Sequence, residues 1–195
     1  MDYILAEKSM KPPKRLGLII NPIAGLGGTV GLKGTDGPEI LAQARALGAV
    51  PRVQERVLEA LAGLSEIEDL FSLLTCRGEM GEEAALAAGL DPTLVVSHPG
   101  KQDTSARDTI DAARAMRDSG VDLLLFAGGD GTARDIFHAV GEGLVTLGIP
   151  AGVKIHSAVF SVNPGIGGEI ASDFLLERIR EIRACEVMDL SLIHI

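Results

Sequence analysis

The chain of 195 residues contains no tryptophan and only one tyrosine, and aromatic residues make up 3% of it. Its interior must therefore be built from leucine, valine, isoleucine and alanine. Hydrophobic residues make up 46% of the sequence, which is enough for a substantial globular core. The length suits one large domain, or one domain with a fragment of another.

Basic residues are also scarce. The chain has 18 lysines and arginines against 27 aspartates and glutamates, so its formal net charge is −9. The basic residues form no stripe along the sequence. Proteins that track nucleic-acid phosphates normally carry such a basic patch, so we do not expect nucleic acid to be a partner.

Long apolar runs are absent as well. No run approaches the roughly 18 residues that a membrane-spanning helix needs. The first residues, MDYILAEKSMKPPKR, lack the apolar segment of a secretory signal. The sequence predicts a soluble, cytoplasmic protein with no membrane partner.

Cysteine is another scarce residue type. Cys76 and Cys185 lie far apart, each in a strand-like stretch, and no Cys-x-x-Cys or Cys/His spacing indicates a metal site. We therefore assign no residue as a metal ligand. A single possible pair is weak evidence for a disulfide framework, so two buried thiols in a reducing cytosol are the favoured interpretation.

Short apolar runs alternate with helical patterns along most of the chain, after a polar lead-in at residues 1–15. Strands are predicted at 16–21, 70–76, 93–97, 121–127, 145–150 and 185–190, and helices after Pro38 and at 81–90, 104–120, about 133–140 and 168–183. Strands that are apolar on both faces and alternate with helices indicate an α/β fold. We expect a three-layer, open, mostly parallel sheet with helices on both faces.

The helix at 104–120 has recognisable end signals. Thr104 or Ser105 can cap its start. Asp108 follows Ser105 at the spacing of a capping box, and Gly120 can end the helix.

Two glycine-rich loops fall at the ends of predicted strands. Residues 21–37 follow the first strand, and residues 128–132 follow the strand at 121–127. In open parallel sheets, ligands bind beyond the carboxyl ends of the strands. The position of both loops is therefore the first argument for a functional site.

The loop at 128–132 reads GGDGT. Gly128, Gly129 and Gly131 lack a Cβ, so backbone N–H groups can approach a ligand closely, and the next helix presents a positive N-terminal end that suits phosphate oxygens. Asp130 would repel a phosphate unless it binds Mg²⁺ or takes a proton from an attacking hydroxyl, and phosphoryl transfer needs both functions. The alternative is a tight turn with Asp130 as the N-cap of the helix.

The loop at 21–37 carries Gly25, Gly27 and Gly28 near its start and Lys33 further on. It matches neither the dinucleotide-binding fingerprint G-x-G-x-x-G nor the P-loop pattern. A long glycine-rich loop can still wrap a polyphosphate, with Lys33 as a point charge. A mobile surface loop is the alternative.

Four stretches carry a resemblance to a known family: NPIAG at 21–25, GLKGTDG at 31–37, LLLFAGGDGTARDI at 123–136 and GIPAGVKIHSAVF at 148–160. They resemble the ATP-NAD kinase family, more closely its branch of ATP-NAD kinase or acetoin-catabolism-associated proteins. The resemblance covers roughly residues 16–189. The GGDGT block is specific to a kinase superfamily that also includes lipid kinases, so it implies a fold like the N-terminal domains of NAD kinases and diacylglycerol kinases.

The resemblance implies an enzyme that uses ATP and Mg²⁺ to phosphorylate the 2′-hydroxyl of the adenosine ribose of NAD, giving NADP. Asp130 would be the catalytic aspartate that engages the accepting hydroxyl. Nucleotides are then the small-molecule partners, and proteins of this family are commonly homo-oligomers. The residues expected to bind the nucleotides are Asn21, Gly25, Gly27, Gly28, Lys33, Gly128, Gly129, Gly131, Thr132, His156 and Ser157.

The stretch AGVKIHSAVF at 151–160 departs from better-known NAD kinases, which have a nearly featureless glycine segment there. Lys154, His156 and Ser157 replace it, which leaves the acceptor open between NAD and another small hydroxylated metabolite. His156 could contact a phosphate or a different substrate, or could stand at the start of a helix that Ser157 caps. A non-catalytic nucleotide-binding or regulatory protein is the third alternative.

The last six residues, LSLIHI at 190–195, are also what CTG TCT CTT ATA CAC ATC encodes, which resembles the end of a transposase library adapter. We expect them to be a cloning or assembly scar; a genuine apolar strand is the alternative. The α/β nucleotide-binding kinase domain is then expected at 16–189. NAD kinases continue from there into a β-rich second domain, so we expect this chain to be truncated.

Overall fold

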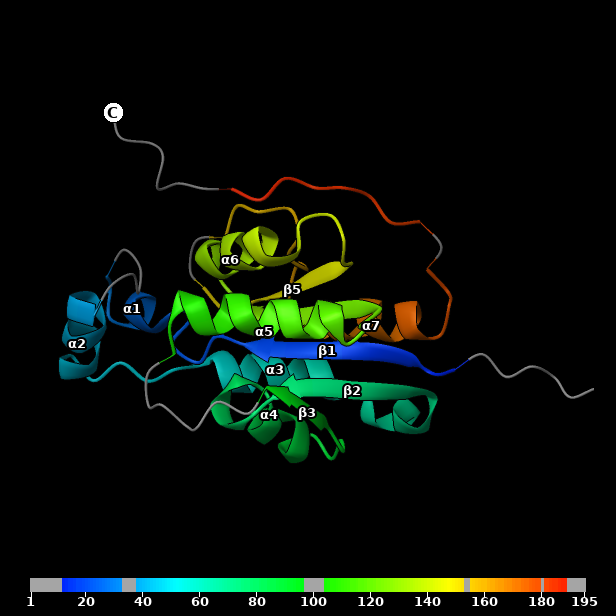
Figure 1. Cartoon of the computed structure of the whole chain (residues 1–195). Helices are drawn as coiled ribbons and strands as arrows, with labels where there is room; N and C mark the ends of the chain where they lie inside the picture. Colours follow the sequence, from blue (N-terminus) through cyan, green and yellow to red (C-terminus); the bar gives the residue numbers. More distant parts are fainter. Residues whose placement is uncertain (1–11, 33–37, 97–103, 153–154, 180, 189–195) are drawn as a thin grey trace, which may run out of the picture.

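A computed structural model of the chain describes residues 12–32, 38–96, 104–152, 155–179 and 181–188 (Figure 1). Its centre is a sheet of five parallel strands in the order β3-β2-β1-β4-β5. The predicted α/β fold with a parallel sheet is confirmed. The strands are β1 Lys14–Ile20, β2 Phe71–Cys76, β3 Thr93–Val96, β4 Leu123–Gly128 and β5 Thr146–Pro150.

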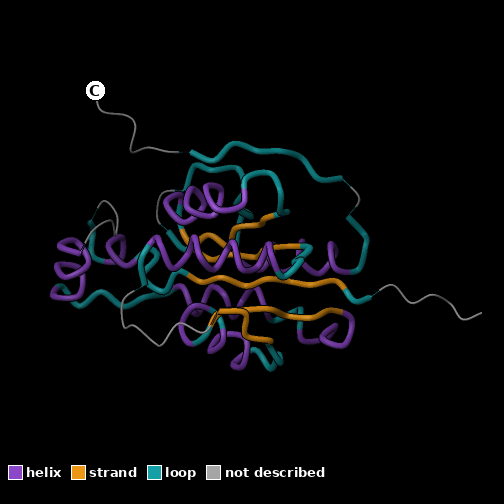
Figure 2. The backbone as a smooth tube through the Cα atoms, in the orientation of Figure 1, coloured by secondary structure: helices purple, strands orange, loops and turns teal. Residues whose placement is uncertain are grey.

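Helices cover both faces of the sheet and complete the three layers (Figures 1 and 2). One apolar cluster joins the sheet to α3 (Val53–Leu61), α4 (Glu82–Ala87) and α7 (Pro164–Leu175). A second cluster joins it to α5 (Ala106–Asp118) and α6 (Asp130–Val140). Because both faces are covered, every residue of β4 is buried. Within the described ranges, no helix is both long enough and apolar enough to cross a membrane.

Shorter elements lie beside this core. The loop predicted at 21–37 contains a short helix, α1 (Leu26–Thr29), which packs with α2 (Pro38–Ala46) through a small apolar cluster of their own. The two helices lie beyond the carboxyl end of β1 (Figure 1). Two 3₁₀ turns, η1 (Ser65–Leu70) and η2 (Gly78–Met80), precede and follow β2.

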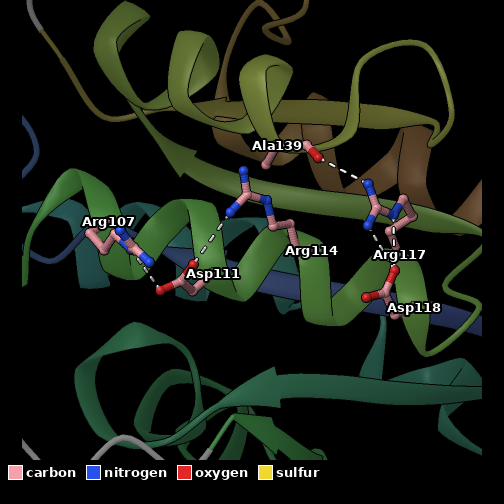
Figure 3. A network of polar contacts seen from close by, with 6 residues as sticks. All are labelled: Arg107, Asp111, Arg114, Arg117, Asp118 and Ala139. Atoms are coloured by element: carbon pink, nitrogen blue, oxygen red, sulfur yellow. Dashed lines mark hydrogen bonds and ion pairs between the residues drawn. The ribbon is translucent and has the colours of Figure 1, made fainter.

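An arginine on α5 fixes the far end of α6 (Figure 3). The Nη1 atom of Arg117 donates to the Ala139 carbonyl, in the last turn of α6, at 3.1 Å. On the same helix, Asp111 pairs with Arg107 at 3.2 Å and with Arg114 at 3.7 Å. Carbonyls in the last turn of a helix lack a donor within the helix. Arg117 therefore completes this end of α6 and joins it to α5.

The predicted ends of α5 are confirmed. The backbone N–H of Ser105 donates to the Asp108 carboxylate at 2.8 Å, as in a capping box. At the other end, Gly120 has a φ of 70° and follows the last helical turn.

The helix predicted at 168–183 lies closer to the N-terminus than expected. α7 starts at Pro164 because the Asn163 side chain caps it, accepting from the Ile166 N–H at 2.9 Å. Proline suits the first helical position, where its missing N–H is not needed. The helix ends before Glu177, whose φ of 57° does not allow a right-handed helix to continue.

The strand predicted at 185–190 is not formed by the residues that the structure describes there, 185–188. This segment meets the loop after β5, where the Ala158 N–H donates to the Glu186 carbonyl at 3.2 Å. A strand needs a repeating ladder of such bonds. The predicted scar at 190–195 lies outside the described residues and stays a prediction.

The two cysteines differ in environment. Cys76 is buried at the end of β2, and burial raises the pKa of its thiol to about 12. Cys185 is exposed and belongs to no strand. The prediction of two buried thiols is therefore confirmed for Cys76 and wrong for Cys185, and both cysteines are free.

We expect a thiol reagent at pH 8 to label Cys185 rapidly and Cys76 only after unfolding, because the thiolate is the reacting form. The measurement is the number of fast-reacting thiols, one in the native protein and two in urea. Cys185→Ser should remove the fast phase and Cys76→Ser should leave it unchanged; two fast thiols in the native protein would contradict this.

The unfolded chain releases the Cys76 proton near pH 9 and the folded chain holds it to about pH 12. The free energy of unfolding should therefore fall as pH rises through that range.

Candidate functional site

The carboxyl ends of β1 and β4 meet where the sheet reverses its strand order. From β1 the chain proceeds to β2 and β3 with α3 and α4 on one face, and then crosses back to β4 with α5 on the other face. Ligands of doubly wound sheets bind at such a reversal. The loop after β1 and the GGDGT loop after β4 both start here.

Asn21, the first residue after β1, joins these two loops. Its backbone N–H donates to the Ala127 carbonyl of β4, and its side-chain Nδ2 donates to the Thr132 hydroxyl of α6, each at 3.0 Å. Its Oδ1 accepts from the Ile23 N–H at 3.3 Å, which sets the orientation of the amide. Thr132 is buried, with 4% of its surface exposed. The Asn21 side chain therefore fixes the first turn of α6 against the end of β1.

α6 starts at Asp130, three residues earlier than the sequence predicted. Its N-cap is Gly129, and Asp130 is the first helical residue, so the alternative in which Asp130 is the N-cap is wrong. The first bond along the helix runs from the Ala133 N–H to the Gly129 carbonyl at 3.1 Å. The N–H groups of residues 129–132 have no acceptor within the helix. They are placed to receive phosphate oxygens at the positive end of the helix.

The Asp130 carboxylate turns toward the loop after β5. It accepts the backbone N–H of His156 on Oδ2 and that of Ser157 on Oδ1, each at 3.0 Å. The buried Ser157 hydroxyl in turn accepts the Met188 N–H at 3.0 Å. No helix begins at Ser157, so the prediction of a helix start there is wrong. Asp130 thus anchors the backbone of the loop at His156, whose side chain is exposed.

Gly25 brings the β1 loop against the end of β5. Its φ is 72°, and a Cβ at this position would overlap the Ala151 carbonyl oxygen. The Ala151 N–H donates to the Gly128 carbonyl at 2.9 Å. Only glycine permits both this backbone conformation and this approach. Three chain segments, after β1, β4 and β5, therefore meet at the edge of the sheet that the carboxyl ends of the strands form.

Most of the predicted site residues gather at this edge. Gly27 and Gly28 lie further along, in α1 beside α2. Lys33 lies outside the described residues, so the point charge expected from it stays a prediction. The residues that the structure brings to the edge are Asn21, Gly25, Gly128, Gly129, Asp130, Gly131, Thr132, His156 and Ser157.

One cation at this edge was missed from the sequence. Arg56, in the first half of α3, donates from Nη1 to the Pro150 carbonyl at the end of β5, at 2.8 Å. The stretch PRVQERV carries Arg52 and Arg56 one turn apart. The apolar spacing of Val53 and Val57 indicates which face of α3 is buried, but only the fold shows which arginine reaches β5.

Among the residues that the structure describes, no group of three or more histidine, cysteine, aspartate or glutamate side chains could hold a metal ion. Mg²⁺ in nucleotide sites is usually held by one or two carboxylates together with phosphate oxygens and water. Asp130 can supply one such carboxylate, because each of its oxygens keeps a lone pair beyond the loop bond.

We expect Asn21→Ala and Thr132→Val each to lower the free energy of unfolding by about 1 kcal/mol, and the double variant to lower it by less than their sum. The reason is that both changes remove one shared hydrogen bond. Urea unfolding of the four proteins measures the coupling. As a control, Asn21→Ala and Ser65→Ala should be additive, because Ser65 lies on η1 at the opposite edge of the sheet. Additivity of the Asn21 and Thr132 changes would contradict the shared bond.

Comparison with known proteins identifies the domain. No curated protein matches the chain. The family model described as ATP-NAD kinase N-terminal domain matches residues 16–175, which include every strand of the sheet except the first two residues of β1. The five-stranded parallel sheet with helices on both faces agrees with this match. The chain therefore belongs to the ATP-NAD kinase N-terminal domain family.

Proposed function

We propose that the chain is the nucleotide-binding domain of a kinase that transfers a phosphoryl group from ATP to the 2′-hydroxyl of the adenosine ribose of NAD. The family match supports kinase chemistry. The observation that carries the proposal is the position of Asp130, a carboxylate on the first residue of a helix whose N–H groups face the strand reversal. Besides anchoring the loop after β5, a carboxylate at a phosphate site can accept a proton or help to hold a cation.

In this proposal, the N–H groups of residues 129–132 bind phosphate oxygens, and Asn21 keeps the first turn of α6 in place. Asp130 accepts the proton of the 2′-hydroxyl while the ribose oxygen bonds to the γ-phosphorus. The bond between that phosphorus and the bridging oxygen breaks, and ADP leaves. When bound, Mg²⁺ would neutralise charge on the phosphates. Positioning supplies most of the rate in such reactions, which fits a site held by three chain segments.

A kinase of the same fold acting on another hydroxylated metabolite is the second candidate. The observation that favours it is the loop at 155–157, which Asp130 holds by two backbone N–H groups. The backbone of His156 therefore lies beside the proposed proton acceptor, and its side chain is exposed, in the stretch that departs from better-known NAD kinases. In this second candidate, an acceptor other than NAD would contact this loop.

The test is phosphorylation of NAD by the chain with ATP and Mg²⁺, followed by a dehydrogenase that responds only to NADP. NADP formation that needs ATP supports the proposal. Consumption of ATP with a panel of sugars and polyols, together with no NADP, would favour the second candidate. If ATP is not consumed with NAD or with any sugar or polyol of the panel, both candidates are overturned. The two free cysteines fit the cytoplasmic location that we propose for the enzyme.

A further inference from the structure

α3 begins at the same edge of the sheet as the candidate site. A helix that connects parallel strands runs back against them, so its first turn lies near their carboxyl ends. Two hydrogen bonds place the first turns of α3 there: Gln54 Nε2 donates to the Glu79 carbonyl after β2 at 3.1 Å, and Arg56 Nη1 donates to the Pro150 carbonyl of β5 at 2.8 Å. The Arg56 guanidinium therefore lies at the carboxyl end of β5, next to the loops that form the site.

Contacts through Pro150 and Ala151 connect Arg56 to both glycine loops. The carbonyl that it binds belongs to the peptide between Pro150 and Ala151. The N–H of that same peptide donates to the Gly128 carbonyl at the start of the GGDGT loop, and the Ala151 carbonyl lies against Gly25 of the β1 loop. One peptide unit thus separates the guanidinium from the GGDGT loop, and the next peptide unit, which carries the Ala151 carbonyl, contacts the β1 loop.

The charge of Arg56 is not matched by a carboxylate among the described residues. Its described partner is a carbonyl, which uses one of the five N–H donors of a guanidinium. Several other arginines, by contrast, form ion pairs at exposed positions, such as Arg52 with Glu55 at 3.3 Å and Arg107 with Asp111 at 3.2 Å. Arg56 is half-buried. Arg56 is thus a half-buried cation at the end of β5, next to the strand reversal, with donors to spare among the described residues, and these are the properties of an anion-binding group.

We infer that Arg56 binds the phosphates of the nucleotide at this site, as a binding residue that no motif of the sequence indicates. This inference rests on the proposed function, which brings a polyphosphate to the edge. The chain carries a net charge of −9, and Asp130 adds a negative charge at the site. A polyphosphate therefore needs a local cation to offset this repulsion. The planar guanidinium can donate two parallel hydrogen bonds to phosphate oxygens while Nη1 stays on Pro150.

The test compares Arg56→Gln with Arg52→Gln, a matched control that removes the same charge one turn earlier on the same helix. ADP binding is measured by titration calorimetry at low and at high NaCl. Arg56→Gln should raise the Kd for ADP about 10- to 100-fold, since hydrogen bonds to charged groups contribute strongly. Arg52→Gln should change it less than about twofold, as expected of an exposed ion pair. Arg56→Lys should fall between wild type and Arg56→Gln, because it keeps the charge without the fork.

The salt series separates a phosphate contact from a structural role. If Arg56 meets phosphate, the Kd for ADP rises with NaCl less steeply in Arg56→Gln than in wild type, because one screened charge pair is gone. If Arg56 only supports the Pro150 carbonyl, both proteins show the same salt dependence, and the inference is overturned. An unchanged Kd in Arg56→Gln, or an equal loss in Arg52→Gln, overturns it as well. A cooperative urea transition confirms that each variant is folded.

The outcomes also distinguish this inference from the proposed function. Loss of ADP affinity in Arg56→Gln, together with no NADP formation by wild type, would leave the phosphate site in place and remove the NAD kinase activity. NADP formation by wild type, with full ADP affinity in Arg56→Gln, would support the proposed function and overturn the role of Arg56. Failure of wild type to bind ADP at all would overturn both.

Discussion

Replacing Asp130 with asparagine should lower the rate of NADP formation by about a hundredfold to ten-thousandfold, the usual contribution of a positioned proton acceptor. Asparagine has nearly the same shape, but its amide cannot take the proton of the 2′-hydroxyl. The measurement is the initial rate at saturating ATP and NAD, with NADP coupled to its dehydrogenase. The substitution changes only the side chain of the first helical residue of α6.

The control for Asp130→Asn is Asp111→Asn, an identical change on the surface of α5. Asp111 pairs there with Arg107 and Arg114. Exposed ion pairs contribute little, so this variant should keep the rate within about twofold of wild type. An Asp130→Asn enzyme that performs like the Asp111→Asn enzyme would remove Asp130 from the chemistry.

Asp130 also anchors a loop, and this second role can be measured separately. Asparagine would present an NH₂ group to one of the two N–H donors of the loop, which costs about 1–3 kcal/mol of stability. Ser157→Ala keeps the backbone N–H that Asp130 holds and removes only the bond from the Met188 N–H. It should lower stability without a comparable loss of rate. An equal loss of rate in both variants would mean that the loop position, and not proton transfer, limits the reaction.

The sheet was predictable because parallel strands that are covered on both faces have short, continuous apolar sequences. β4, with the sequence LLLFAG, is buried along its whole length, and its flanking turn residues mark where it ends. The loop bond of Asp130 was not predictable. Asp130 and His156 lie 26 residues apart, and the donors are backbone N–H groups, which every residue except proline carries. No side-chain pattern can therefore indicate them.

The limits of α7 show where local signals were available and where they were overridden. Asn163 followed by Pro164 is a recognised start signal, and the structure uses it. Past the end of the helix, the residues LERIREIR keep a helical spacing of apolar positions. The left-handed conformation of Glu177 nevertheless ends the helix. Periodicity predicts a helix, but it does not show where the chain must turn to follow the rest of the fold.

Replacing Gly25 with alanine should lower the free energy of unfolding by roughly 2–5 kcal/mol. A left-handed φ costs a residue with a Cβ roughly 1–2 kcal/mol, and an added methyl group in a filled space costs roughly 1–3 kcal/mol more. Both conditions hold here, because φ is 72° and the new Cβ would overlap the Ala151 carbonyl oxygen. For a chain of this size, the melting temperature should fall by about 5–15 °C.

Gly48→Ala separates the two contributions to this loss. Gly48 has a φ of 79°, close to that of Gly25, but a Cβ there would meet nothing within 4 Å. It should therefore show only the conformational cost of roughly 1–2 kcal/mol. Because Ala151 is bonded to the Gly128 carbonyl, displacing it disturbs the GGDGT loop, so Gly25→Ala should also weaken ADP binding and Gly48→Ala should not. Equal effects of the two substitutions on stability and on ADP binding would show that the β1 loop does not need to touch the end of β5, and the three-segment site would lose its main structural support.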